Sequence, residues 1–385
     1  MSWVYFFLFG AVGALSPYQS LYYQQMGLSG TEISWLMSVT PILVFISQPI
    51  FGPLTDRSGH RGQMLARLLV VVAATCALVA LGHSFWTMLP LVALWSFFSS
   101  VLVPIGDSIA LGEVVRKGGD YSRIRLWGSI GFLIVSYLTG YLYKLIDLRW
   151  MFLVYAALML IAWYYARRLP AEGVSAPKSV WSGVAGLLKN KLLLAFLLCS
   201  SIVWMSQAAH STFYSVRMAE IGGASETVGL AYSLAALMEV PVWMVLGRIT
   251  RRTGPLPLLA FASIMYGIRW QLVAVVTVPG VLVAMQVMQA VTFALFMTTA
   301  IVFVGQQTPP ELRASGQALL SLVQGGIATV IGTRGAGYIV DTYGTAQLYK
   351  VGSYCAFAGG AGFCVLLLAM YLQKKRAGAR LATGA

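Results

Sequence analysis

The chain has 385 residues, of which 58% are hydrophobic and 10% are charged, and its formal net charge is +14 at pH 7. Soluble domains contain about 45–50% apolar and about 25% charged residues, so this composition excludes a water-soluble enzyme. The four cysteines lie in apolar stretches and form no Cys-x-x-Cys pair, which leaves no basis for a disulfide framework or a zinc module. We therefore expect an integral membrane protein that needs no metal and no other cofactor.

Apolar stretches long enough to cross a bilayer follow one another along the whole chain. A transmembrane helix needs about 20 apolar residues. The expected spans are residues 3–24, 31–54, 62–82, 85–110, 123–143, 147–168, 191–213, 225–247, 256–276, 280–304, 316–338 and 346–372. The first begins at Trp3 without a basic leader, so we interpret it as a helix and not as a signal peptide. The sequence predicts an all-α membrane protein with twelve transmembrane helices.

Basic residues lie mainly on one side of these spans. The even number of spans places both termini on one side, and 20 of the 26 Lys and Arg residues flank that side. The opposite side has Lys144, Arg149, Arg217 and Lys350, and two arginines, Arg269 and Arg334, lie within spans. The positive-inside rule predicts that both termini are in the cytoplasm and that the protein is in the cytoplasmic (inner) membrane. The basic charge thus orients the chain in the bilayer, and we expect no nucleic-acid partner.

The chain divides into two similar halves. Residues 169–190 are the least apolar long connection, and we expect a central cytoplasmic loop there. It separates a six-helix bundle at 1–168 from a second bundle, with a short cytoplasmic tail, at 191–385. Spans two and eight end in related sequences, Gly-Pro-Leu-Thr-Asp-Arg-Ser-Gly from Gly52 and Gly-Arg-Ile-Thr-Arg-Arg-Thr-Gly from Gly247, which are 195 residues apart. Pseudo-symmetric halves are typical of secondary transporters, which bind their solute between the halves near the bilayer midplane.

The loop after span two carries the pattern Gly-x3-Asp-Arg-x-Gly-x-Arg, formed by Gly52, Asp56, Arg57, Gly59 and Arg61. It resembles the signature loop of the major facilitator superfamily. The resemblance implies the major facilitator fold and a gating role, in which the loop helps to latch the halves in one orientation. The alternative is a basic turn that only fixes topology.

Two opposite charges lie in the middle of spans eight and nine. Each ionised side chain at a helix centre costs about 2.5–3.5 kcal/mol, so Glu239 and Arg269 require partners or a function. Their distances from the turn near Arg252 place them at similar depth on adjacent antiparallel helices. We expect them to pair. The pair is either a structural link between two helices or a proton-linked switch, in which Glu239 takes up a proton when Arg269 moves away.

A second pair, Asp107 and Arg125, flanks the loop between spans four and five at similar depth. The sequence from Arg123 to Phe132, Arg-Ile-Arg-Leu-Trp-Gly-Ser-Ile-Gly-Phe, resembles the phenylpropionate permease group, a branch of the superfamily related to lactose permease and other proton symporters. The resemblance covers nearly the whole chain. It implies that Asp107 and Arg125 bind the solute, that Phe132 stacks on a solute ring, and that Glu239, Arg269 and Asp107 participate in proton coupling.

Span ten departs from that pattern. It has Gln289 and Thr292 where the relatives carry titratable side chains, and neither residue carries a proton near neutral pH. Coupling then depends on Glu239, Asp107 or His210. His210, in span seven, is a core residue, a solute ligand or a proton site.

Further polar and aromatic residues lie in spans that usually line the cavity of this fold. Tyr18 and Tyr22 share a face of span one, and Gln286 and Gln289 share a face of span ten. We expect these four and His210 to contribute to solute binding, although Tyr22 also fits the aromatic belt at the membrane interface.

These features together predict a secondary active transporter that functions as a monomer. It would move an aromatic acid, sugar or nucleoside across the cytoplasmic membrane by alternating access with proton symport. One alternative is a proton-coupled efflux antiporter, which usually carries a Gly-Pro motif in span five; residues 123–143 contain no proline. Another is a membrane sensor that binds without transport. No span carries a His-Glu-x-x-His, paired-aspartate or Gly-x-Ser-x-Gly motif, so we do not expect an enzyme.

Overall fold

The structure is a computed structural model that describes residues 1–58, 60–117, 120–169 and 184–383. These residues form α-helices with short 3₁₀ and π segments, and they contain no strand. The first span consists of α1 (Ser2–Leu15) and α2 (Gln19–Gln25). The next five are α3 (Gly30–Ser58), α4 (Arg61–Val79), α5 with α6 (Phe85–Ser99 and Leu102–Lys117), α7 (Tyr121–Leu145), and η1 with α8 (Leu148–Trp150 and Met151–Ala166).

The second half begins with a short helix, α9 (Val184–Leu187), and continues with six more spans. Spans seven to nine are α10 (Lys191–Glu220), α11 (Ser225–Thr253) and α12 (Pro255–Val275). Span ten consists of α13 (Pro279–Ala284), η3 (Met285–Gln289), η4 (Ala290–Ala294) and α14 (Leu295–Gln307). The remainder is η5 (Pro310–Leu312), α15 (Arg313–Ser321), η6 (Leu322–Ala328) and α16 (Thr329–Thr383).

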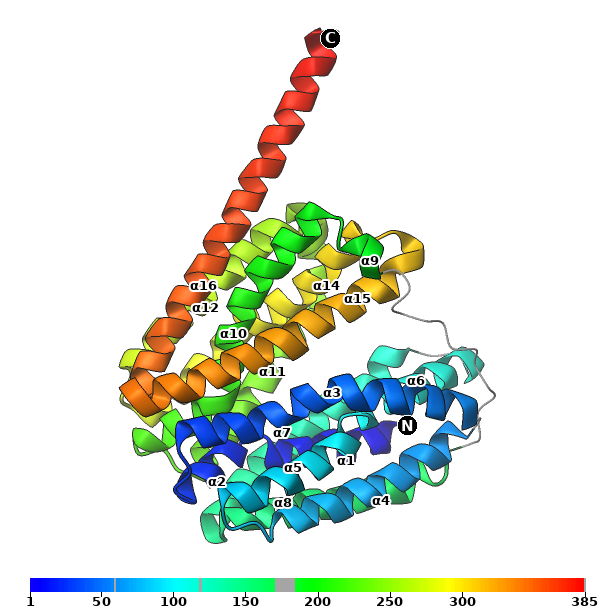
Figure 1. The fold of residues 1–385 in the computed structure, drawn as a ribbon, viewed down its shortest axis with the longest axis vertical. Coiled ribbons are helices and arrows are strands. Elements are labelled where there is room, and N and C mark those ends of the chain that lie inside the picture. Colours follow the sequence, from blue (N-terminus) through cyan, green and yellow to red (C-terminus); the bar gives the residue numbers. More distant parts are fainter. Residues whose placement is uncertain (59, 118–119, 170–183, 384–385) are drawn as a thin grey trace.

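The last apolar segment contains two spans. Eleven segments of the described chain are long and apolar enough to cross a membrane, and the last of them, Pro310–Leu372, has 63 residues. At 1.5 Å per residue it would be about 95 Å long, roughly three bilayer cores. Gly344 breaks α16 with a φ of 80°, which glycine adopts without strain, and Figure 1 shows the chain reversing there. The described residues therefore contain the twelve predicted spans.

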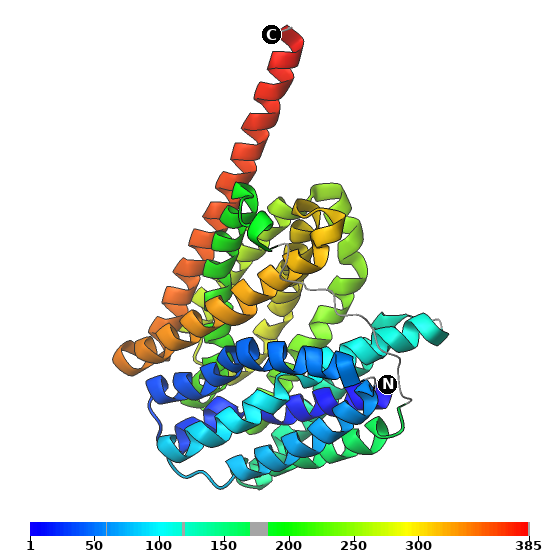
Figure 2. The same ribbon diagram turned by 45° about the vertical axis from the view of Figure 1, so that its right-hand side comes forward.

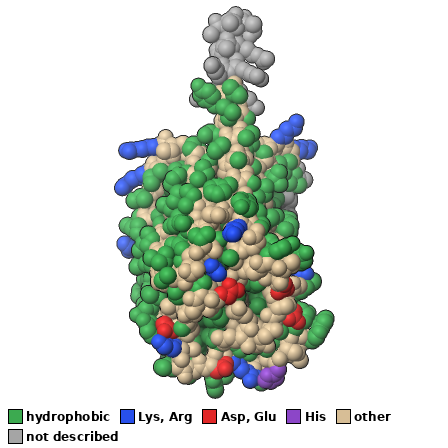
Figure 3. All heavy atoms as spheres, turned by 90° about the vertical axis from the view of Figure 1, so that its left-hand side faces the viewer, with side chains coloured by type: hydrophobic (Ala, Val, Ile, Leu, Met, Phe, Trp, Pro, Cys, Tyr) green, Lys and Arg blue, Asp and Glu red, His purple; other side chains and the backbone are tan. Residues whose placement is uncertain are grey.

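The twelve spans form two bundles that meet at one end of the molecule. In the first bundle α1 packs against α7 and α8; in the second, α10 and α12 pack against α16. We call the end where α1 begins and α16 ends the terminal face, and the end with α2 and the turn at Gly344 the distal face. Figures 1 and 2 show the bundles meeting at the distal face and diverging toward the terminal face. Figure 3 shows the distal face, where scattered charges of both signs lie among other side chains.

Two spans are interrupted inside the bundles. Pro17 has no N–H, so the helix of span one breaks there: the Tyr18 N–H bonds to the Leu15 carbonyl at 3.1 Å, and the Tyr143 hydroxyl donates to the Ala14 carbonyl at 2.9 Å. Span ten changes to 3₁₀ and then π geometry between Met285 and Ala294. Such irregular turns inside helices are frequent at functional sites.

A helix cap fixes the start of α7 at the terminal face. The Asp120 side chain accepts a hydrogen bond from the Ser122 N–H at 2.9 Å. This hydrogen bond holds the pKa of the Asp120 carboxyl below its usual value. The ionised carboxylate also suits the positive end of the helix dipole, so Asp120 stabilises the helix that carries Arg125 and Phe132.

The bundles approach closely at the distal face because glycines lie at the contacts. A Cβ on Gly229 of α11 would lie 2.5 Å from the Ser136 carbonyl oxygen of α7. A Cβ on Gly337 of α16 would lie 2.5 Å from the Gly30 carbonyl oxygen of α3. Both distances are too short for any side chain, so the distal closure depends on these glycines.

We predict that Gly337→Val separates the bundles at the distal face, because the added side chain collides with the α3 backbone. Leu81 and Tyr343 are both exposed and lie one in each bundle. Spin labels at these two positions would report the distance between the bundles by double electron–electron resonance spectroscopy. Gly335→Val is the matched control, since a Cβ there meets nothing within 4 Å. Identical distance distributions in the wild type and Gly337→Val would show that this contact does not hold the bundles together.

Candidate functional site

The Arg269 side chain lies inside the second bundle and is satisfied by neutral acceptors. It is 1% exposed. Its guanidinium donates to Gln289 Oε1 at 2.5 Å, to Thr292 Oγ1 at 2.9 Å and to Gln286 Oε1 at 2.7 Å. The three acceptors recur every third residue through the irregular turns of span ten, which keeps them on one side of that span. The positive charge is therefore buried with hydrogen-bond partners, as a buried charge requires.

Gln289 lies between Arg269 and Glu239. Its amide oxygen accepts from Arg269, and its Nε2 donates to Glu239 Oε1 at 3.1 Å. Arginine has only donors, so the network itself fixes the orientation of the amide. The predicted direct ion pair of Glu239 and Arg269 is therefore wrong: their depths match, but the Gln289 side chain occupies the space between them. Gln289 carries no proton, yet it connects the acid to the arginine.

Asp107 and Arg125 lie in the first bundle and contact different partners. Asp107 Oδ1 accepts hydrogen bonds from the hydroxyls of Tyr5, at 2.5 Å, and Tyr121, at 2.8 Å. The Arg125 guanidinium lies over the Phe9 ring, 4.0 Å from its centroid. Both charged side chains are half-buried. Tyr5, Phe9 and Tyr121 were not predicted from the sequence. Tyr5 and Phe9 lie more than 100 positions from the side chains they contact, and nothing in the local pattern marks Tyr121 as a partner of Asp107.

The absence of a side chain at Gly128 of α7 leaves space for the Arg125 guanidinium to stack on the Phe9 ring. A Cβ on Gly128 would lie 2.7 Å from Phe9 Cδ2 and 3.0 Å from Arg125 Nη1. Phe132, one turn further along α7, is half-buried. Its backbone packs on span one, where a Cβ on Gly13 would lie 2.7 Å from the Phe132 carbonyl oxygen. The arginine and Phe132 thus lie on the part of α7 that packs against span one.

Tyr18 and Tyr22 of span one are buried, and Tyr18 also reaches the second bundle, where a Cβ on Gly229 of α11 would lie 2.5 Å from its hydroxyl. Tyr18 is fully buried, donates its hydroxyl to the Ser136 carbonyl at 2.6 Å and packs edge-on against Tyr143. Tyr22 is 6% exposed and packs edge-on against Phe152. The structure therefore places both side chains in the packing behind the distal closure and does not bring them to Asp107 and Arg125.

His210 lies in an aromatic cluster of the second bundle. It is 7% exposed, and its ring centroid is 4.3 Å from that of Trp270 and 4.8 Å from that of Tyr214. Its Nδ1 lies 3.3 Å from the Tyr349 hydroxyl. Of the three roles left open by the sequence, this environment favours a core residue that supports Trp270, the neighbour of Arg269.

The predicted gating loop is only partly described. Gly59 and the side chains of Asp56 and Arg57 lie outside the described residues. Arg61 begins α4, and Gly52 lines a hollow of about 240 Å³ between α3 and α6 together with Phe51 and Pro104. A Cβ on Gly52 would meet nothing within 4 Å, and the same holds for its repeat partner Gly247.

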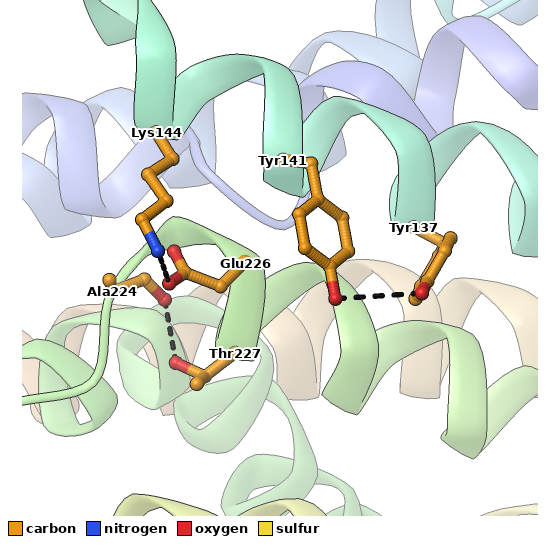
Figure 4. Close-up of polar contacts among 6 residues, drawn as sticks. All are labelled: Tyr137, Tyr141, Lys144, Ala224, Glu226 and Thr227. Carbon is orange, nitrogen blue, oxygen red and sulfur yellow. Dashed lines mark hydrogen bonds and ion pairs between the residues drawn. The ribbon is translucent and has the colours of Figure 1, made fainter.

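Polar contacts close the site at the distal face. The Lys144 ammonium of α7 lies 2.6 Å from Glu226 Oε1 in the first turn of α11, as Figure 4 shows. Asp341 of α16 accepts from the backbone N–H groups of Gly30, at 2.5 Å, and Thr31, at 2.8 Å, at the start of α3. Each contact joins the two bundles. An anion at a helix N-terminus is favourable, so Asp341 stabilises the closure at the start of α3, and Glu226 stabilises it through the ion pair with Lys144.

Comparison with known proteins places this fold in a family. The chain matches the model of the MFS_1 like family over residues 1–351. It is 30% identical over 374 residues to the maltose permease of Geobacillus stearothermophilus, an alignment that covers 97% of this chain and 94% of that protein. The chain belongs to the MFS_1 like family. The MFS_1-like protein is therefore a multi-pass membrane transporter of small solutes and is not an enzyme.

Further comparisons agree with this assignment. The MFS_1-like protein is 26% identical to the probable 3-phenylpropionic acid transporter of Escherichia coli (strain K12), over 88% of this chain and 90% of that one. Among solved structures, the nucleoside transporter NupG superposes with a TM-score of 0.84 at 17% identity, covering 94% of this chain and 97% of that chain. An auto-inhibited POT family peptide transporter gives a TM-score of 0.71 at 15% identity, covering 95% of this chain and 96% of that chain. The predicted major facilitator fold is confirmed.

We predict that Gln289→Leu lowers the unfolding temperature of the purified protein. The substitution removes an acceptor from the buried Arg269 guanidinium and a donor from Glu239, and each buried group left unsatisfied costs about 1–3 kcal/mol. Gln317→Leu is the control, because the same substitution there removes one exposed hydrogen bond, from the Gln317 amide to the Ile301 carbonyl, and leaves no buried charge without a partner. Equal unfolding temperatures for the two variants would contradict a bridging role for Gln289.

Proposed function

We propose that the MFS_1-like protein imports a small organic solute, a sugar, nucleoside or aromatic acid, together with a proton. The observation that carries the proposal is that both bundles contain partly or fully buried charged side chains with defined partners. In one bundle these are Asp107, bonded to two tyrosines, and Arg125, stacked on Phe9. In the other, Gln289 links Glu239 to Arg269. The two bundles touch at the distal face. Relatives named as a maltose permease, a probable 3-phenylpropionic acid transporter and a putative nucleoside transporter support these three solute classes.

The chemistry of Asp107 and Arg125 suits such solutes. Stacking on Phe9 occupies one face of the Arg125 guanidinium and leaves its N–H edge for a hydroxyl or carboxylate. Both tyrosine hydroxyls donate to Oδ1 of Asp107, which leaves Oδ2 to accept from a solute hydroxyl. This combination binds one donor and one acceptor of the same small molecule.

Glu239 is the proposed proton carrier. As a carboxylate it accepts from the Gln289 amide, whose oxygen in turn accepts from Arg269. A proton on the accepting oxygen of Glu239 turns it into a donor, which opposes the Nε2 donor of Gln289 and favours reorientation of the amide. Reorientation withdraws an acceptor from Arg269, so protonation at one end of the network changes the other end.

Orientation in the membrane follows from the distribution of basic residues. With both termini in the cytoplasm, the terminal face is cytoplasmic and the distal face is external. The closed distal face then corresponds to the state that exchanges solute with the cytoplasm. Each chain contains both bundles and both sets of charged side chains, which supports function as a monomer in the cytoplasmic membrane.

Uptake by proteoliposomes tests the proposal. We expect maltose, uridine or 3-phenylpropionate to accumulate when the liposome interior is alkaline, and not when the proton gradient is dissipated. Liposomes without protein are the control. Solute accumulation that is independent of the proton gradient would reject proton coupling. Solute export driven by the same proton gradient would indicate an antiporter, and solute binding without any flux would indicate a sensor.

Two substitutions separate solute binding from coupling. Arg125→Gln should abolish binding and all flux, because the neutral amide replaces a stacked guanidinium that could donate two hydrogen bonds to the solute. Glu239→Gln should keep solute exchange across the membrane and lose accumulation, because the amide cannot take up the proton. Arg123→Gln, an exposed neighbour on the same helix, is the matched control. Counterflow and accumulation are measured side by side for each variant. Normal solute accumulation by both Arg125→Gln and Glu239→Gln would contradict both proposed roles.

A further inference from the structure

Two otherwise covered spans each contain one exposed residue, and the two residues are related by the internal repeat. Between Val4 and Gln24 in span one, Ser16 alone is exposed; between Cys199 and Ala219 in span seven, Ser211 alone is exposed. These serines are 195 residues apart, the same offset that relates Gly52 to Gly247. Both halves thus place an exposed hydroxyl at the same position of their first span.

The two serines face the space between the bundles. Ser20 Oγ and Ser215 Oγ, also 195 residues apart, lie 3.0 Å from each other across the bundle interface. Ser211 lies one turn of α10, about 6 Å, from that contact toward the terminal face, and Ser16 lies four residues from it on the same side, across the break of span one. Because α1 is covered on its other sides by α7 and α8, and α10 by α16, the exposed face of each serine is the one between the bundles.

Gln207 adds an acceptor at the same level. It lies one turn before Ser211, is 6% exposed and donates from Nε2 to Ser211 Oγ at 3.2 Å. Its Oε1 is buried and has no hydrogen-bond partner among the described residues. A buried acceptor without a partner costs about 1–3 kcal/mol, so a ligand that donates a hydrogen bond there removes that cost.

The local backbone and the aromatic neighbours fit a binding site. Ser16 lies at the break of span one next to Pro17, and discontinuous helices form the solute sites of many transporters. Two turns toward the terminal face, the repeat-related residues Phe9 and Trp204 occupy the same helix faces. The Arg125 guanidinium stacks on the Phe9 ring, and the ring centroids of Trp204 and Phe293 lie 6.0 Å apart. Aromatic side chains therefore lie on the terminal-face side of the two serines.

We propose that Ser16, Ser211 and Gln207 form a solute subsite at the inner end of the space between the bundles. Resting on the proposed transport function, the subsite takes a hydroxyl or amide N–H group of a neutral, ring-bearing solute. The three side chains are uncharged, and the free oxygen of Gln207 repels a carboxylate. The subsite therefore selects sugars or nucleosides over aromatic acids.

Thiol labelling tests the position of the subsite without any transport assay. In a background with the four native cysteines replaced by alanine, Ser16→Cys and Ser211→Cys should react with a membrane-impermeant maleimide from the terminal face, and a short bis-maleimide should join the two in the double variant. Ser263→Cys is the control, because Ser263 is fully buried and bonds to the Leu259 carbonyl of its own helix. Failure of both cysteines to react would overturn the proposal.

Solute protection and affinity test its chemistry. Maltose or uridine should slow the labelling of both cysteines, and Gln207→Met should raise the dissociation constant of the protecting solute about tenfold. Ser201→Ala, which removes a hydroxyl bonded only to its own helix, should leave that constant unchanged. Protection by 3-phenylpropionate alone, or unchanged affinity in Gln207→Met, would overturn the proposed selectivity. If none of the three solutes is taken up, the proposed function fails, while the labelling still decides whether the subsite lines the space between the bundles.

Discussion

The buried guanidinium of Arg269 is the constraint around which the second bundle is organised. A cation in the hydrocarbon core must have acceptors, and span ten supplies three of them, Gln286, Gln289 and Thr292. Their side chains converge through 3₁₀ and π turns that a regular helix would not contain. Because Gln289 also donates to Glu239, the arrangement that stabilises the positive charge connects it to the acid.

Internal duplication explains the geometry of the interface between the bundles. Ser20 meets Ser215, one repeat away, and glycines allow α7 to approach α11 and α3 to approach α16 at the distal face. A Cβ on either of the repeat-related glycines Gly52 and Gly247 would meet nothing within 4 Å. The same sequence elements therefore lie in close contact near one face and apart near the other, as alternating access between two faces requires.

The spans, the duplication and the depth of the intramembrane charges could be predicted because each depends on hydropathy and on counting residues along helices. Partners across helices could not. Asp107 binds Tyr5, 102 residues away, and nothing in the sequence identifies which of many aromatic side chains reaches it. Glu239 and Arg269 have matching depths, but whether they touch depends on the side chain between them, and the turns that place Gln289 there are not evident from local propensity.

The most direct test of the bridging network is the coupling free energy between Arg269 and Glu239. A double-mutant cycle of Arg269→Met and Glu239→Gln, measured from unfolding free energies of the purified protein, would be determined with Gln289 present and again with Gln289→Leu. If the amide connects the two charges, we expect a coupling of about 1 kcal/mol or more in the first background and close to zero in the second. The same coupling in both backgrounds would show that the charges interact directly, and would contradict the account.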